Sequence, residues 1–253
     1  MKPLMKAEDR LFVALDVETP EQALGLVRTL RGHTNSFKIG SKLFTAAGPG
    51  LVREIVSQGA RVFLDLKFHD IPTVVAAAAA EAARLGVFLF TVHAAGGREM
   101  MRQAAAAAAE AADRNRHRRP LVVGVTVLTS ADQTSLEEIG VKRSLRDQVL
   151  GLARLSAESG LDGVVASPLE VQLIRTSITS SDFLIVTPGV RPAPPKVSDD
   201  QRRVTSPGEA IKAGASYLVV GRPILDASDP TQATREIVQQ IELGLNALAE
   251  PHK

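Results

Sequence analysis

The sequence predicts an α/β fold, a single (β/α)8 barrel that spans residues 1–253 as one domain. Eight short runs rich in Val, Ile, Leu and Phe alternate with longer stretches of helical pattern. No linker rich in Pro, Gly or Ser divides the chain, and barrels of this class commonly reach this length as one domain. Hydrophobic residues make up 45% of the chain and aromatic residues only 4%, so we expect a core of Val, Leu, Ile and Ala beneath covering helices.

The predicted strands are short and rich in β-branched residues, as expected for strands buried on both faces. They span residues 11–15, 37–39, 62–66, 88–92, 121–128, 163–166, 183–186 and 217–220. The predicted helices alternate with them and span residues 20–30, 42–57, 72–85, 97–112, 144–159, 168–175, 207–213 and 230–249.

Residues suited to helix ends support these boundaries. Several helices begin with Pro in the first turn, after a residue that can cap the helix: Thr19, Ser167, Ser206 and Asp229. Others end at a residue that accepts a left-handed backbone: Gly59, Gly86, Gly160 and Gly214. A doubly wound open sheet is the alternative fold, but DVETPEQA follows the first strand in place of a dinucleotide-binding glycine fingerprint.

Composition narrows the classes of function. The chain has 30 Lys and Arg against 28 Asp and Glu, so its pI of about 9.0 reflects the lack of groups that titrate between His and Lys. We therefore expect no nucleic-acid partner. The absence of Cys excludes disulfides, thiolate metal sites and cysteine nucleophiles. No apolar run could span a bilayer and MKPLMKAEDR does not resemble a secretory signal, so we predict a cytoplasmic protein without a membrane partner.

Polar residues recur where the predicted strands end, and a (β/α)8 barrel builds its active site at those carboxyl ends. Alternation along RVFLDLKFHDIP turns Asp65 and Lys67 into the barrel mouth, where an unpaired charge is costly. This pair alone could be a structural ion pair. However, Asp16 and Lys38 on the two preceding strands extend it into an alternating array of charges. An ion pair that only closes the end of the barrel does not require such an array.

Phosphate-binding candidates follow the last two strands. Gly221 and Arg222 in VVGRP lie where barrels often bind phosphate, although a tight turn with an exposed arginine is the alternative. The longest irregular segment, residues 188–206, is either disordered or functional. Its place after the seventh strand favours a ligand-binding loop, with Arg191 and Gln201 directed at the same phosphate. We interpret His69 and His93 as structural, because no second His lies at metal-ligand spacing.

Together these motifs resemble the orotidine 5'-phosphate decarboxylase family. The match runs in order along nearly the whole chain: ALDV at 14–17, FKIG at 37–40, DLKFHDIP at 65–72, VTVLTS at 125–130, LDGVVAS at 161–167, TPGVRP at 187–192, DDQRR at 199–203 and VVGRP at 219–223. The Asp-x-Lys-x-x-Asp element at 65–70 is specific to this family and its close decarboxylase relatives. The resemblance implies decarboxylation of orotidine 5'-monophosphate to UMP in pyrimidine biosynthesis, without a metal or organic cofactor.

The same resemblance implies roles for individual residues. Lys67 would be the general acid that protonates the ring carbon, Lys38 and Asp65 would hold it in place, and Asp70 would complete the array from the partner subunit of a homodimer. The implied substrate-binding residues are Asp16, Lys38, Asp65, Ile71, Thr73, Thr129, Arg191, Gln201, Gly221 and Arg222. Val74 departs from the family pattern, which has Thr at this position, so Thr73 either replaces that hydroxyl contact or the contact is absent.

Two other functions stay open at this point. A related magnesium-dependent decarboxylase of keto-sugar phosphates shares the Asp-x-Lys-x-x-Asp element but carries a carboxylate on the second strand, where Lys38 would here repel a divalent ion. A non-catalytic barrel that binds a phosphate ligand is the other alternative. The complete charged array argues against it.

Overall fold

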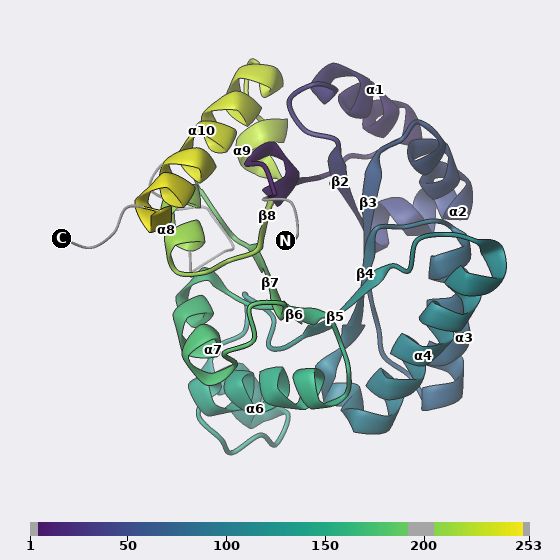
Figure 1. The fold of residues 1–253 in the computed structure, drawn as a ribbon, viewed down its shortest axis with the longest axis vertical. Coiled ribbons are helices and arrows are strands. Elements are labelled where there is room, and N and C mark those ends of the chain that lie inside the picture. Colours follow the sequence, from purple (N-terminus) through teal and green to yellow (C-terminus); the bar gives the residue numbers. More distant parts are fainter. Residues whose placement is uncertain (1–4, 192–204, 250–253) are drawn as a thin grey trace.

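The structure, a computed structural model, describes residues 5–191 and 205–249. Within this part of the chain, eight parallel strands form a closed barrel in sequence order, with β8 paired to β1 (Figure 1). The strands are β1 (Leu11–Ala14), β2 (Ser36–Gly40), β3 (Arg61–Phe68), β4 (Leu89–His93), β5 (Leu121–Val125), β6 (Gly163–Val165), β7 (Leu184–Pro188) and β8 (Tyr217–Val220). The predicted (β/α)8 barrel, or TIM barrel, is confirmed.

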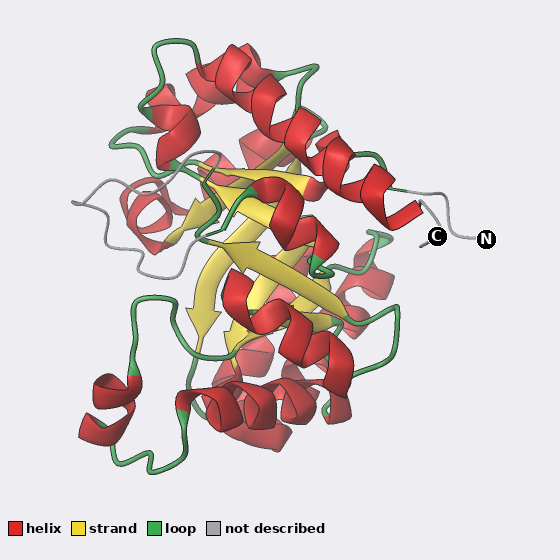
Figure 2. Ribbon diagram, turned by 90° about the vertical axis from the view of Figure 1, so that its left-hand side faces the viewer, coloured by secondary structure: helices red, strands yellow, loops and turns green. Residues whose placement is uncertain are grey.

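Helices surround the barrel on its outer side (Figures 1 and 2). The α-helices are α1 (Pro20–Leu30), α2 (Ser41–Ser57), α3 (Pro72–Arg84), α4 (Gly97–Asn115), α5 (Gln133–Glu138), α6 (Leu145–Glu158), α7 (Val171–Ser177), α8 (Pro207–Lys212), α9 (Arg222–Leu225) and α10 (Pro230–Ala249). Three short 3₁₀ helices are η1 (Glu8–Arg10), η2 (Ala94–Gly96) and η3 (Pro168–Glu170). None of the helices in the described residues combines the length and apolar character needed to cross a membrane.

Most predicted helix ends lie within two residues of the observed ones, but α4 continues to Asn115, η3 precedes α7, and one predicted cap differs. Thr19, Ser206 and Asp229 accept backbone N–H groups of the first helical turns with their side chains. At Ser167 the backbone N–H donates to Glu170 instead, and the buried hydroxyl has no hydrogen-bond partner. The four predicted terminal glycines have φ between 73° and 108°, in the left-handed region that closes a helix: Gly59, Gly86, Gly160 and Gly214.

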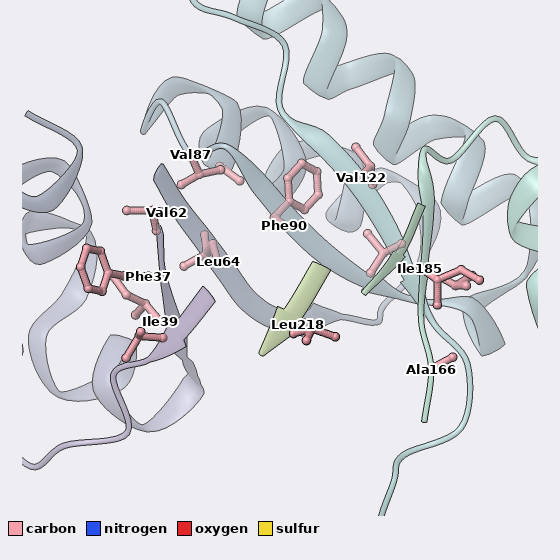
Figure 3. Packing of buried hydrophobic residues seen from close by; sticks show 14 of the residues in the cluster. Phe37, Ile39, Val62, Leu64, Val87, Phe90, Val122, Ala166, Ile185 and Leu218 are labelled. Atoms are coloured by element: carbon pink, nitrogen blue, oxygen red, sulfur yellow. The ribbon is translucent and has the colours of Figure 1, made fainter. Parts of the chain in front are cut away.

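Two apolar clusters hold the barrel together. The larger lies between the strands and the helices, and includes Val62, Leu64 and Ile185 (Figure 3). The smaller fills the barrel interior and consists of Phe12, Ala14, Phe63, Leu89, Val123, Val186, Tyr217 and Val219. The prediction of a core made of Val, Leu, Ile and Ala was wrong in one respect, because four of the eight Phe residues are fully buried: Phe12, Phe37, Phe63 and Phe90. Their large apolar area compensates for their small number.

The amino-terminal end of the barrel is filled by Arg61. Its guanidinium lies 4.8 Å from the ring centre of Phe88 and 5.7 Å from that of Phe12, and pairs with Asp9 at 3.3 Å. Burial lowers the pKa of Arg61, and Asp9 opposes this shift. Since arginine stays protonated even so, the side chain closes this end as a paired cation. The polar opening of the barrel lies at the opposite end.

The fifth strand ends earlier than predicted. β5 stops at Val125 and not at residue 128, and the N–H and the hydroxyl of Thr126 both donate to the carbonyl oxygen of Val165, at 3.3 and 3.0 Å. The chain then leaves the sheet and forms a wall of the pocket described below. α5 lies in the stretch after it, where the sequence pattern predicts no helix.

Candidate active site

A pocket of about 560 Å³ opens at the carboxyl ends of the strands. Its polar lining includes most of the predicted site residues, namely Asp16, Lys38, Asp65, Lys67, Thr129, Arg191, Gly221 and Arg222. Lys38, Asp65 and Lys67 lie on β2 and β3, and the others follow the ends of β1, β5, β7 and β8. The structure therefore brings together residues that lie up to 206 positions apart in the sequence.

One carboxylate lies between two ammonium groups at the base of this pocket. Asp65 Oδ2 is 2.9 Å from Lys67 Nζ and 3.9 Å from Lys38 Nζ. Lys38 Nζ is also 3.1 Å from Asp16 Oδ1, so the four charges form a chain across β1, β2 and β3. The alternating array predicted from the sequence is thus present in the structure.

Burial differs along the array. The side chains of Lys38 and Asp65 are only 12% and 14% exposed, whereas Lys67 is 36% exposed. The partly buried centre strengthens the electrostatic interactions between these groups, because less water screens them. Lys67 lies on the open side, so its ammonium is the one best placed to meet a ligand while Asp65 holds it.

The backbone at Lys67 is unusual. Its φ is +52°, a left-handed conformation that costs a non-glycine residue about 1–2 kcal/mol. The pairing of β3 with β4 shifts here, since Leu64 lies opposite Phe90 but Phe68 lies opposite Val92. This bulge belongs to the strand that carries Asp65 and Lys67, and local bulges commonly redirect side chains near active sites.

The phosphate-binding candidates lie on other strands of the same pocket. Gly221 follows β8 directly, and Arg222 begins α9. A Cβ atom at Gly221 would lie 3.4 Å from Ala14 and 3.5 Å from Asp16, so this loop packs close to the array. The N–H of Arg191 donates to the carbonyl of Thr205 at 3.0 Å, beside an isolated bridge between Val190 and Thr205. Gln201 lies outside the described residues.

Comparison with known proteins agrees with this arrangement. The model of the orotidine 5'-phosphate decarboxylase / HUMPS family matches residues 9–237. The chain belongs to this family. A curated orotidine 5'-phosphate decarboxylase from Syntrophotalea carbinolica is 51% identical over 242 residues, which cover 96% of this chain and 98% of the relative. The enzyme of that name from Syntrophomonas wolfei is 49% identical over 240 residues, 94% of this chain and 100% of the relative.

A solved structure of the family extends the comparison to three dimensions. The crystal structure of orotidine 5'-phosphate decarboxylase from Lactobacillus acidophilus superimposes with a TM-score of 0.82. It is 38% identical in sequence, and the match covers 92% of this chain and 99% of that one. The barrel and its order of strands are therefore those of the family.

Three predicted site residues lie outside the pocket of this chain. Asp70, Ile71 and Thr73 are exposed at the start of α3 and do not line the pocket. Asp70 Oδ1 accepts the N–H of Ile71 at 2.6 Å, and the described ion pairs of the array do not include it. Ile71 is 63% exposed and Val74 is 47% exposed, so an apolar surface adjoins Asp70.

His69 and His93 lie near the ends of β3 and β4, outside the charged array. Their rings stack with centres 5.2 Å apart, and His93 Nδ1 accepts the N–H of Ala95. Burial lowers the pKa of His93, and the nearby His69 and Lys67 lower it further. Neither His69 nor His93 lines the pocket. Among the described residues, no three His, Cys, Asp or Glu side chains gather as a possible metal site.

The apolar part of the pocket contains none of the site residues predicted from the sequence. This part includes Phe63, Val125, Val127, Leu128, Val165 and Val219. Alternation along the strands indicates that Phe63 and Val165 face inward. Leu128 carried no such signal, and both Val127 and Leu128 lie beyond the end of β5. A flat ligand could rest on this surface with its polar groups toward the array.

Proposed function

We propose that this protein decarboxylates orotidine 5'-monophosphate to UMP and carbon dioxide in pyrimidine biosynthesis, as a carbon–carbon lyase. The observation that carries the proposal is the Lys38–Asp65–Lys67 array beside a pocket with two arginines. The chain is also about half identical, over nearly its full length, to proteins named for this reaction. The proposal includes the cytoplasmic location and the single-domain organisation of residues 1–253 predicted from the sequence.

Each part of the substrate has matching groups in the pocket. Arg222 and Arg191 would bind the phosphate with charge-assisted hydrogen bonds, next to Gly221, and Gln201 would complete this group. Asp16 and Lys38 would bind the ribose hydroxyls. Thr129 and the apolar wall around Val127 would contact the pyrimidine ring.

The chemical step requires only side chains of the protein itself, and these include the partner subunit's Asp70 in the dimer proposed below. The bond between C6 of the ring and its carboxylate breaks, carbon dioxide leaves, and the electron pair stays on C6. The Lys67 ammonium stabilises this developing negative charge and then transfers a proton to C6 as general acid. Asp65 and Lys38 keep the Lys67 ammonium at that position through the contacts described above. The neutral amine regains its proton from solvent.

We further propose a homodimer in which Asp70, Ile71 and Thr73 enter the pocket of the partner subunit. All three are exposed beside the pocket and lie outside it in their own chain. The exposed apolar side chains of Ile71 and Val74 suit a surface that a second copy covers. Thr73 supplies a side-chain hydroxyl next to Val74, the position at which the family pattern has Thr.

The arrangement of charges favours a metal-free reaction over the magnesium-dependent alternative within the same family. Both Asp16 and Asp65 are engaged by Lys38, at 3.1 and 3.9 Å. A divalent cation at these carboxylates would face the Lys38 ammonium at close range, which is repulsive. We therefore assign the two carboxylates to the lysines and to the substrate.

Purified wild-type protein should convert orotidine 5'-monophosphate to UMP in the presence of EDTA. The reaction is followed by the change in ultraviolet absorbance of the pyrimidine. Turnover that depends on added magnesium would contradict the metal-free proposal, and magnesium-dependent decarboxylation of a keto-sugar phosphate in place of orotidine 5'-monophosphate would support that alternative. Binding of the nucleotide without any turnover would instead support a non-catalytic barrel.

Arg222→Ala should weaken substrate binding more than it slows turnover. Loss of a charge-assisted hydrogen bond to phosphate costs about 1.5–3 kcal/mol, so KM should rise roughly ten- to a hundredfold. Arg114→Ala is the matched control, because Arg114 pairs with Glu110 on the exposed face of α4. Steady-state kinetics measure both variants. A specificity constant equal to that of wild type would show that Arg222 is only a turn residue.

A further inference from the structure

Thr91 lies directly behind the charged array. It is fully buried near the middle of β4, the neighbour of β3 in the barrel. Among the described residues β4 contributes no side chain to the pocket, so Thr91 is not placed to touch a ligand. Any influence of Thr91 on the reaction has to pass through the residues that it contacts.

The Thr91 hydroxyl makes two hydrogen bonds, both to the catalytic segment of β3. Thr91 Oγ1 accepts the backbone N–H of Lys67 at 2.8 Å. The same hydroxyl donates to Asp65 Oδ1 at 3.1 Å. The other carboxylate oxygen, Asp65 Oδ2, holds Lys67 Nζ at 2.9 Å. One hydroxyl thus contacts Lys67 at its backbone, and through Asp65 also at its ammonium.

The bulge in β3 explains why a side chain is needed at this place. Between the paired positions Leu64–Phe90 and Phe68–Val92, β3 advances four residues while β4 advances two. Regular ladder hydrogen bonds therefore cannot continue through the bulge. The left-handed backbone turns the Lys67 N–H, which donates to the Thr91 side chain.

We propose that Thr91 is a positioning residue of this active site, whose hydroxyl fixes the bulged Lys67 backbone and the Asp65 carboxylate in one arrangement. A hydroxyl suits this place because it accepts from an N–H and donates to a carboxylate at the same time. The ammonium of Lys67 depends on both contacts for its position. The inference rests on the proposed function, because the kinetic test detects the position of the Lys67 ammonium through the proton that it transfers.

Three variants test this inference. Thr91→Val keeps the shape of the side chain and removes the hydroxyl, whereas Thr91→Ser keeps the hydroxyl. Thr34→Val is the matched control, because Thr34 is also buried and its hydroxyl donates to the carbonyl of Leu11 and accepts the N–H of Ser36. Thr34 lies two residues before β2 and does not line the pocket.

We expect kcat to fall in the variant that lacks the Thr91 hydroxyl and to stay high in the variant that keeps it. Thr91→Val should lower kcat by about 10- to 100-fold, the scale of a catalytic group displaced by about 1 Å, with KM within roughly threefold of wild type. Thr91→Ser should recover most of this loss, and Thr34→Val should keep wild-type kcat while its Tm falls. A Thr91→Val enzyme that is folded and has wild-type kcat would overturn the inference.

Hydrogen exchange tests the contact without reference to turnover. In the wild-type protein the Lys67 amide should exchange slowly, because Thr91 accepts its hydrogen; in Thr91→Val its exchange should be faster, and in Thr91→Ser it should stay slow. An unprotected Lys67 amide in the wild type would overturn the inference even if Thr91→Val failed to fold. An inactive wild type with a protected amide would count against the proposed function and leave the contact itself established.

Discussion

Lys67→Ala should lower kcat by about 10⁴-fold or more while the protein keeps its fold. The substitution removes the group that we assign as general acid, an effect of roughly 10² to 10⁴ by itself, and also the cation that stabilises the charge developing on the ring. KM should change far less, because the phosphate and ribose contacts stay in place. Steady-state assays with orotidine 5'-monophosphate measure both constants.

A matched lysine separates this effect from a general loss of charge. Lys212 is exposed in the last turn of α8 and does not line the pocket, so Lys212→Ala should retain wild-type kcat. The left-handed φ of residue 67 disfavours alanine as it does lysine, so unfolding curves should be similar for Lys67→Ala and wild type. A Lys67→Ala enzyme with more than a tenth of wild-type kcat would contradict the role of Lys67.

Asp70→Ala should also be nearly inactive alone, but it should regain activity when mixed with Lys67→Ala. If Asp70 acts in the pocket of the partner subunit, each mixed dimer contains one pocket with both residues intact and one with neither. Equal amounts that exchange freely form mixed dimers in half of all cases, so about a quarter of wild-type activity should return. The assay follows turnover against time after mixing.

The control for this experiment uses two residues of one pocket. Lys38 and Lys67 of the same chain share the Asp65 carboxylate. A mixture of Lys38→Ala with Lys67→Ala therefore has no intact pocket in any dimer, and its activity should stay low. If Asp70→Ala mixed with Lys67→Ala stayed equally low after subunit exchange, Asp70 would act within its own chain or would not be required.

Much of the site could be predicted because it depends on simple alternation. Asp65 and Lys67 differ by two positions on a strand, so they point to the same side, and the parallel order of the barrel places Lys38 and Asp16 next to them. The closed barrel itself followed from the repeated strand and helix pattern. These features need no knowledge of individual contacts.

Other features depend on contacts that the pattern does not contain. A lysine carries no preference for left-handed backbone, so the bulge at Lys67 and its bond to Thr91 had no signal in the sequence. The hydrogen bond of the Thr126 hydroxyl to Val165, just beyond the end of β5, likewise has no counterpart in the hydrophobic pattern. The edge-on packing of the Phe12 ring against Phe63, with ring centres 5.6 Å apart, depends on the space to be filled inside the barrel, and alternation gives only the side to which Phe63 points.

The bulge in β3 also has a consequence for attempts to stabilise the protein. Glycine or asparagine would adopt a φ of +52° more readily than lysine does, so a chain optimised only for stability would place one of them there. Backbone-based design that aims only at stability would replace residue 67 and remove the ammonium that we propose as general acid, so such design should leave this residue unchanged.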